Sequence, residues 1–352
     1  MKKIKAILFI FLSYSLALAQ VGGDVVFESL TLPATPRSAA LGGMAIGLQT
    51  HDIGLGIDNP ALIDSAVDRN IHFNTTFYPA GINFGSLAYG FHTKRAGNFV
   101  AALRYVSYGK FDGYDPSGTP TGTFKGGDYA VQVGTGRSYK KLIYGLDAKL
   151  LFSHLETYNS IALATDVSVG FHNETKRTTA TLMVKNLGIQ LKSYTSDARE
   201  KLPWDISLGF SKGLKKIPFT FNIVAHHLQK WDLTYDDPNQ VEETNIFGEP
   251  VKKKSGFVDN LFRHFVFGTE IDIKRVVALR IGYNHLQRKE LQFDAKKGMG
   301  GLSAGLGLHI KQFDIDYAYA RYGIVASANH LGITVNLHEF GWKKTKSSAL
   351  PE

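Results

Sequence analysis

One stretch decides the fold: from Leu142 to Ser153 the chain reads LIYGLDAKLLFS. Apolar residues such as Tyr144 recur at every second position, and the positions between them include the charged Asp147 and Lys149. A repeat of two residues indicates a β-strand, and a tilted strand needs about 9–11 residues to cross a bilayer. Strands in soluble proteins are usually shorter, about 5–6 residues. The stretch therefore predicts a membrane-spanning strand with one face toward lipid.

The same alternation recurs from Asn70 to near the end of the chain. We count fourteen such segments, and antiparallel outer-membrane barrels have an even number of strands. They cover residues 71–77, 82–92, 99–105, 129–133, 142–153, 161–171, 180–184, 204–210, 219–225, 265–271, 277–283, 302–310, 313–319 and 331–337. The second segment changes phase near Gly85 and Ser86, which predicts a β-bulge. The sequence thus predicts an all-β protein, a 14-stranded antiparallel transmembrane β-barrel.

The connections between the segments alternate between short basic turns and longer polar loops. Lys140-Lys141 and Lys274-Arg275 are typical of the turns, and the long loops cover residues 110–127, 186–203, 228–260 and 287–298. In outer-membrane barrels the short turns face the periplasm and the long loops face outward. We therefore expect both termini of the barrel on the periplasmic side, with residues 341–352 as a periplasmic tail.

The beginning of the chain indicates the compartment. Lysines at positions 2, 3 and 5 precede an apolar run from Ala6 to Leu18, and small residues favour cleavage after Ala19. This is the pattern of a secretory signal peptide, and a retained membrane anchor is the alternative. We expect residues 1–19 to be a signal peptide and residues 70–340 to form a barrel in the cell outer membrane.

Residues 20–69 lack strand alternation and are too apolar for a well-solvated segment. Thr35-Pro36 suits the start of a short helix that Gly42 and Gly43 would end, and Asn59-Pro60 suits the start of a second. We interpret residues 20–69 as a hatch, a plug that enters the barrel from the periplasm. A loose periplasmic tail is the alternative.

Charged residues occur at positions that should face the lumen. They are Arg104, Asp147, Lys149, Asp166, Asp205, Glu270, Asp272, Arg280, Asp314 and Asp316. Unpaired charges at membrane depth are expensive, so we expect these residues to pair with one another or with lumen water. Arg37 of the hatch is a candidate partner for these inward carboxylates, such as Asp314 or Asp316, and the sequence does not assign which one it meets. A transport path through the lumen is the alternative.

The sequence contains no recognisable catalytic or metal-binding motif. Twelve histidines occur, but none lies in a His-Glu-x-x-His motif, and His226-His227 would point to opposite faces of a strand. Gly-x-Ser-x-Gly is also missing, and cysteine is absent, so disulfides and thiolate ligands are excluded. The net charge of +9 comes without an aromatic-interleaved basic patch, so we expect no nucleic-acid binding. We expect neither an enzyme, nor a metal, nor a cofactor.

Several motifs, taken together, resemble one known family. They are GGDVVFE (22–28), RSAALGG (37–43), NPAL (59–62), AGINFG (80–85), KNLG (185–188), REKLP (199–203) and HLQKWDL (227–233). The chain is similar to the PorQ family, outer-membrane components of the type IX secretion system of Bacteroidetes, and more broadly to FadL-like barrels. The resemblance implies partnership with the sortase PorU, the shuttle barrel PorV and the surface protein PorZ. This complex attaches secreted cargo to lipopolysaccharide, and its chemistry belongs to PorU.

Two functions follow as hypotheses. The first is an anchoring barrel whose longest loop docks a partner, because this loop mixes aromatic and acidic residues. The candidate docking residues are Trp231, Tyr235, Asp236, Asp237, Phe247 and Phe257. The alternative is a FadL-like transporter of hydrophobic small molecules, which requires an apolar pocket inside the barrel and a lateral gap in its wall.

Overall fold

The computed structural model describes residues 25–195, 199–234, 243–244, 250–251, 256–290, 299–322 and 326–340. The predicted signal peptide (1–19) and C-terminal tail (341–352) lie outside the described residues. Among the described residues, no helix is both long and apolar enough to cross a membrane.

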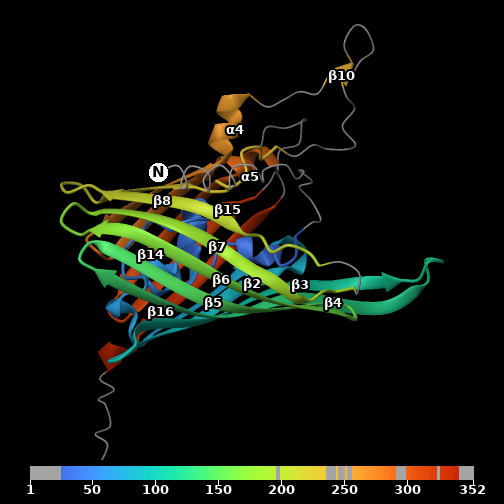
Figure 1. Cartoon of the computed structure of the whole chain (residues 1–352), viewed down its shortest axis with the longest axis horizontal. Coiled ribbons are helices and arrows are strands. Elements are labelled where there is room, and N and C mark those ends of the chain that lie inside the picture. The colour runs from blue at the N-terminus through green and yellow to red at the C-terminus, as the bar shows by residue number, and fades with distance from the viewer. Residues whose placement is uncertain are drawn as a thin grey trace, which may run out of the picture.

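Fourteen antiparallel strands form a closed barrel, as predicted, and the pairing of β1 with β16 closes it (Figure 1). The strands are β1 (Asn70–Phe77), β2 (Asn83–Thr93), β3 (Gly97–Tyr114), β4 (Pro120–Tyr139), β5 (Leu142–Leu155), β6 (Tyr158–Asn173), β7 (Thr178–Lys192), β8 (Asp205–Gly213), β9 (Phe219–Ala225), β12 (Phe265–Ile273), β13 (Val277–Asn284), β14 (Leu302–Ile310), β15 (Phe313–Arg321) and β16 (Ser327–Asn336). A separate two-stranded ribbon joins β10 (Glu243–Thr244) and β11 (Pro250–Val251). We call the barrel end with the short turns the turn end and the opposite end the loop end.

The outer face of the barrel is apolar, as a lipid-facing surface must be. One row of paired residues crosses seven neighbouring strands, and all of its members are exposed apolar residues. The row consists of Phe73, Leu87, Leu103, Val131, Leu150, Leu163 and Ile189. A closed barrel satisfies its backbone hydrogen bonds within lipid, and this belt faces the acyl chains. The chain is therefore an integral β-barrel of the outer-membrane type.

Three sequence predictions about the strands need correction. Pairing of β2 with β1 and β3 runs without a shift past Gly85 and Ser86, so no bulge lies there. The phase changes because Phe84 points inward, where its ring packs 5.7 Å from that of His330. Residues 110–127 are mostly a long β3–β4 hairpin that projects beyond the barrel, rather than a loop (Figure 1). Similarly, β7 extends to Lys192 into the predicted loop 186–203.

The N-terminal segment fills the lumen with short helices: η1 (Glu28–Thr31), α2 (Pro36–Ala40), α3 (Ile53–Asp58), η2 (Pro60–Leu62) and η3 (Ser65–Val67) (Figure 1). Thr35 caps α2 by accepting a hydrogen bond from the Ser38 backbone N–H, and Asn59 caps η2 in the same way. The plug backbone lies directly against the wall. A Cβ on Gly282 would come within 2.1 Å of the Gly42 nitrogen, so only glycine fits there.

The plug runs the length of the barrel. Val25 forms a bridge to Lys201 at the loop end, and Ser29 donates a hydrogen bond to Asp128 near that end. The chain then descends to the turn end, where the Leu337 N–H donates to the Arg69 carbonyl. The first and last described residues therefore lie at opposite ends. The two termini of the barrel strands, Asn70 and Asn336, pair with each other at the turn end, so they lie on one side as predicted. The plug, however, begins at the loop end at Val25 instead of entering from the turn end. That the turn end faces the periplasm stays a prediction.

Four short helices lie outside the lumen. η4 (Pro79–Gly81) joins β1 to β2, and η5 (Leu337–Phe340) follows β16 at the turn end. α4 (Phe257–Arg263) precedes β12, and α5 (His285–Glu290) follows β13, both at the loop end (Figure 1). α4 and α5 are in contact and together form a polar and aromatic surface at the loop end of β12 and β13.

Candidate functional site

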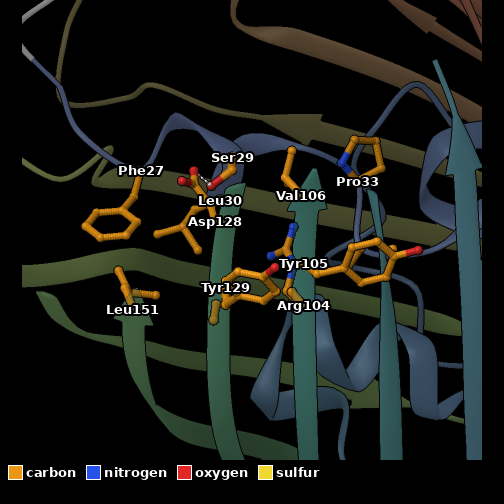
Figure 2. Close-up of a pocket in the computed structure, with 13 residues that line it drawn as sticks. Phe27, Ser29, Leu30, Pro33, Arg104, Tyr105, Val106, Asp128, Tyr129 and Leu151 are labelled. Carbon is orange, nitrogen blue, oxygen red and sulfur yellow. Dashed lines mark hydrogen bonds between the residues drawn. The ribbon is translucent and has the colours of Figure 1, made fainter. Parts of the chain in front are cut away.

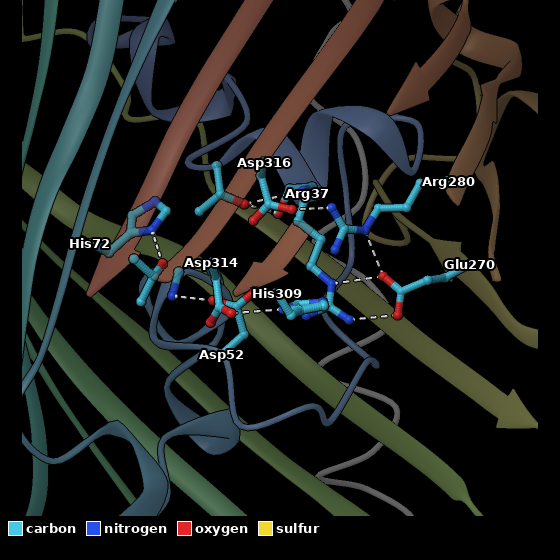
Figure 3. Close-up of polar contacts among 12 residues, drawn as sticks. Arg37, Asp52, His72, Glu270, Arg280, His309, Asp314 and Asp316 are labelled. Carbon is cyan, nitrogen blue, oxygen red and sulfur yellow. Dashed lines mark hydrogen bonds and ion pairs between the residues drawn. The ribbon is translucent and has the colours of Figure 1, made fainter. Parts of the chain in front are cut away.

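A buried ionic network ties the plug to the wall, and we call it the Arg37 network. Arg37 binds Glu270 with two parallel hydrogen bonds of 2.6 and 3.0 Å. Its third contact is Asp52 of the plug at 3.1 Å. Arg280 on β13 also donates to Glu270, at 2.7 Å, and to Asp316 on β15 (Figure 3). Glu270 therefore lies between two buried guanidinium groups, one from the plug and one from the wall.

The structure does not pair Arg37 with the carboxylates that the sequence suggested. Asp316 accepts a hydrogen bond from Arg280 instead (Figure 3). Asp314 lies toward the turn end, where the His309 ring contacts it at 2.8 Å. The Asp314 side chain is 46% exposed, so it needs no buried partner. Glu270 lies within reach because α2 packs against β13, β14 and β15.

A second buried cluster, the Lys149 network, lies on the opposite part of the wall. The Lys149 ammonium donates to Asp166 at 2.6 Å and to Asn186 at 2.9 Å, and it lies 4.0 Å from Asp147. All four side chains are buried. Its charged members lie on β5 and β6 and Asn186 lies on β7, so the cluster shapes the wall between these strands.

Two further inward charges, Arg104 and Asp205, make their hydrogen bonds outside these two networks. Arg104 donates to the Leu32 carbonyl at 2.7 Å, and Asp205 accepts hydrogen bonds from Ser207 and from the His227 backbone N–H. Within the described part of the chain, Asp272 Oδ1 has no hydrogen-bond partner. The ten predicted lumen charges thus divide among separate local arrangements instead of one continuous network.

The cavity between the plug and strands β3 and β4 is small. It has a volume of about 20 Å³ and lies among Leu30, Arg104 and Asp128 (Figure 2). Asp128 accepts hydrogen bonds from Ser29, Tyr108 and Ser153, so its carboxylate on the polar side of the cavity is already satisfied. A space of this size holds about one water molecule. It offers no room for an acyl chain or an aromatic substrate.

An aromatic cluster stands at the loop end, on and beside α4. Phe257 and Val258 are 69% and 63% exposed, and the Trp231 ring lies 5.3 Å from that of Phe257. Both ring nitrogens of the buried His264 face carbonyl oxygens, those of His226 and Trp231, which fixes the loop against the wall. Of the predicted docking residues, Trp231 and Phe257 meet here. Tyr235, Asp236, Asp237 and Phe247 lie outside the described residues.

Asp259 fixes the orientation of α4. It accepts hydrogen bonds from Arg263, His285 and Lys289, at 3.1, 3.2 and 2.7 Å. Burial raises the pKa of Asp259, but the three hydrogen bonds outweigh this effect and lower its pKa to about 2. Asp259 is thus ionised at neutral pH and joins α4 to α5. Phe257 and Val258 at the start of α4 stay exposed beside this charged contact.

Sequence analysis missed an opening in the wall between β7 and β8. The two strands pair only from Thr178 to Lys185 on β7, and beyond that point a groove of about 450 Å³ lies between β7 and residues 199–204. Asn186, where the strands part, has a φ of +54°. The signal in the sequence is Asn186 followed by Gly188, at the start of the predicted loop 186–203.

No metal site is formed by the described residues: no three His, Asp or Glu side chains are placed to hold an ion. The prediction that His226 and His227 point to opposite faces of a strand is wrong: β9 ends at Ala225, His227 has a φ of +54°, and the two rings lie 4.7 Å apart. His226 is buried, while His227 lies 3.2 Å from Asp205. The geometry therefore offers binding surfaces and a filled lumen.

Comparison with known proteins finds similar barrels among solved structures. No protein-family model and no curated protein sequence matches the chain. Among solved structures, the toluene transporter TodX of Pseudomonas putida is 12% identical, with a TM-score of 0.47 over 86% of this chain and 96% of that one. The toluene transporter TbuX of Ralstonia pickettii is 10% identical (TM-score 0.48; 88% and 98%). A Pseudomonas aeruginosa FadL homologue is 9% identical (0.48; 87% and 98%). At these values the likeness concerns the barrel alone.

Proposed function

We propose that this protein is a non-enzymatic anchoring barrel of the outer membrane, which holds a partner protein at the membrane surface. The observation that carries this proposal is the contrast between the plugged lumen and the exposed apolar residues of α4 at the loop end. The lumen is filled by a plug held through buried ion pairs, whereas α4 presents exposed aromatic residues beyond the rim. Exposed apolar clusters with a polar border are typical of protein-binding surfaces.

The motifs that resemble the PorQ family support a specific form of this proposal. The partners would be a PorU-like sortase, a PorV-like barrel and a PorZ-like surface protein of a type IX secretion system. Lipopolysaccharide would be the acceptor of the cargo that this complex attaches. Trp231 belongs to the motif HLQKWDL and also forms part of the aromatic cluster, so one segment contributes to both arguments.

The test is a pull-down of the tagged full-length protein from its native outer membranes. We expect recovery of a sortase-like protease and a second barrel. The double variant Phe257→Ser, Val258→Ser should lose these proteins while the barrel still shows the heat-dependent gel migration of a folded barrel. Tyr114→Ser provides the matched control, because Tyr114 is 62% exposed but lies on the β3–β4 hairpin. Equal recovery with all variants would contradict the proposed docking surface.

A transporter of hydrophobic small molecules is the second candidate; TodX and TbuX are toluene transporters. The observation in this chain that favours it is the groove of about 450 Å³ in the wall between β7 and residues 199–204. Uptake of radiolabelled toluene and dodecanoic acid by cells with and without the protein tests it. Protein-dependent uptake, together with an empty pull-down, would replace the anchoring proposal by transport.

A further inference from the structure

The groove between β7 and residues 199–204 begins at a β-bulge, and buried charged side chains hold this bulge in place. Between β6 and β7 the pairing shifts, so that both Lys185 and Asn186 stand opposite Asp166. The Asn186 backbone N–H donates to Asp166 at 2.7 Å, and its side chain accepts from Lys149 at 2.9 Å. β-Bulges bend a strand and often adjoin functional sites. A buried ammonium and carboxylate thus fix the point at which β7 leaves β8.

The bulge also reverses the outward face of β7. Before the bulge the exposed residue is Leu182, and after it Leu187 and Ile189 are exposed, at 40% and 63%. One extra residue exchanges the two faces of a strand because side chains alternate with a period of two. The outer part of β7 therefore keeps an apolar face toward the outside although it has lost β8 as a neighbour.

Residues 199–204 cover the opening from within. Asn186 donates to the Pro203 carbonyl at 3.0 Å, and Gln190 accepts from the Glu200 backbone N–H at 2.8 Å. Leu202 is buried in one apolar cluster with Phe27 and Leu30 of the plug. These contacts span the gap, so an extended strand of another protein cannot pair with the edge of β7 without breaking them. What remains is a groove that carries the exposed Leu187 and Ile189 of β7 on its outer side.

The chemistry of the groove fits a lipid. Its lining includes Leu187, Ile189, Arg199, Glu200, Lys201 and Trp204. Ile189 continues the row of lipid-facing residues through its pairing with Leu163. Trp204 is 42% exposed at the start of β8, and tryptophan is typical of membrane interfaces. Arg199 and Lys201 are exposed beside these apolar residues, and basic side chains at this level attract anionic headgroups.

We propose that this groove binds one anionic membrane lipid of the leaflet at the loop end. An acyl chain lies along Leu187, Ile189 and Trp204, and the phosphate of the headgroup contacts Arg199 and Lys201. The lipid seals the place where the strand ladder between β7 and β8 is interrupted. Continuity with the lipid-facing belt favours this occupant over a protein segment.

Quenching of Trp204 fluorescence by brominated lipids tests the proposal. The full-length protein, with Trp231→Phe and Trp342→Phe so that Trp204 is the remaining tryptophan, is placed in phosphatidylcholine vesicles. Brominated phosphatidic acid or brominated phosphatidylcholine is then added in increasing fractions. We expect phosphatidic acid to quench at a far lower fraction. Arg199→Gln with Lys201→Gln should weaken its apparent affinity about thirtyfold, since each of the two basic residues contributes about 1 kcal/mol near an anionic headgroup.

The matched control is Lys110→Gln with Lys125→Gln. These two exposed lysines face each other on the β3–β4 hairpin, away from the groove, so their removal should leave the affinity unchanged. Heat-dependent gel migration verifies that each variant is folded. Equal quenching by both lipids at every fraction would overturn the proposal. So would protection of Trp204 from both lipids by a copurified protein, which would assign the groove to a partner.

Discussion

At the scale of single residues, Glu270 is the charge on which the attachment of the plug depends. It shares its two carboxylate oxygens between Arg37 and Arg280, and all three side chains are buried. Removal of one member of a buried ionic group leaves the remaining charges without compensation, which is more damaging than the loss of a surface pair. The residue thus couples the plug to β12 and β13.

We expect Glu270→Gln to lower the free energy of unfolding by about 3 kcal/mol, because two buried guanidinium groups lose a shared anion. Urea unfolding of the purified barrel in detergent micelles measures this change. Asp314→Asn is the control: its pair with His309 is half-exposed, so its removal should cost less than about 1 kcal/mol. Equal losses in the two variants would show that the Arg37 network does not stabilise the plugged barrel.

Asp259 gives the loop end a defined response to pH. Its pKa in the folded protein, about 2, lies below the ordinary value for an aspartate, so ionisation stabilises the α4–α5 contact. This stabilisation is complete above the ordinary pKa and is lost as the pH falls through about 4 toward 2. In a variant that keeps Trp231 as the sole tryptophan, its emission should shift over this pH range, because Trp231 packs on Phe257 of α4. The shift should disappear in Asp259→Asn. An unchanged shift would assign it to another group.

At the scale of elements, the plug fits the barrel through close backbone contact rather than through large side chains. Ala40 on α2 is fully buried, and a Cβ on Gly305 would lie 2.5 Å from the Ala40 Cβ. The Ala40 carbonyl also accepts a hydrogen bond of 2.9 Å from Ser303. Such a contact leaves no space for a larger residue on either side.

We therefore expect Ala40→Trp to displace α2 and to expose the N-terminal segment to protease, because an overpacked interior relaxes poorly. Limited proteolysis followed by mass spectrometry of the fragments measures this. Ala96→Trp is the matched control, since Ala96 lies exposed in the turn between β2 and β3. Complete resistance of the Ala40 variant would show that α2 does not need this close contact.

The sequence predicts those elements whose signal is local. The alternation from Leu142 onward is sufficient for a strand, and Thr35-Pro36 is sufficient for the start of α2, because a strand face and a helix cap involve neighbouring residues. Helix α3 escaped notice because Gly54 and Gly56 are poor helix formers, and burial inside the barrel supplies the missing stability.

Features that depend on distant partners could not be predicted. The bulge at Asn186 requires Asp166 and Lys149, which are far apart in the chain and meet only in the closed sheet. For the same reason the sequence could not assign the inward carboxylate that Arg37 meets: the rotation of α2 in the lumen decides that it reaches Glu270. Phe84 misled the strand analysis because it is an apolar residue on the inward face, where the alternation rule expects a polar one.

At the scale of the whole molecule, the barrel encloses the plug, and the inward face of the barrel wall carries more acidic than basic residues. The inward carboxylates of the wall are Asp128, Asp147, Asp166, Asp205, Glu270, Asp272, Asp314 and Asp316. The inward cations that face them are Arg104, Lys149 and Arg280. Arg37 brings a further positive charge from the plug to Glu270. The plug therefore both blocks the lumen and offsets part of its negative charge.

Deletion of residues 25–64 should convert the closed barrel into a cation-selective pore. The intact protein should show no stable conductance in a planar bilayer, because the plug and its ion pairs occupy the lumen. Without the plug, carboxylates outnumber cations along the wall, and acidic linings favour the passage of cations. The reversal potential in a potassium chloride gradient measures the selectivity. Asp316→Asn and Glu270→Gln in the deleted protein should reduce it, whereas Asp115→Asn on the exposed β3–β4 connection should not. An intact protein that conducts as well as the deleted one would show that the plug does not close the lumen.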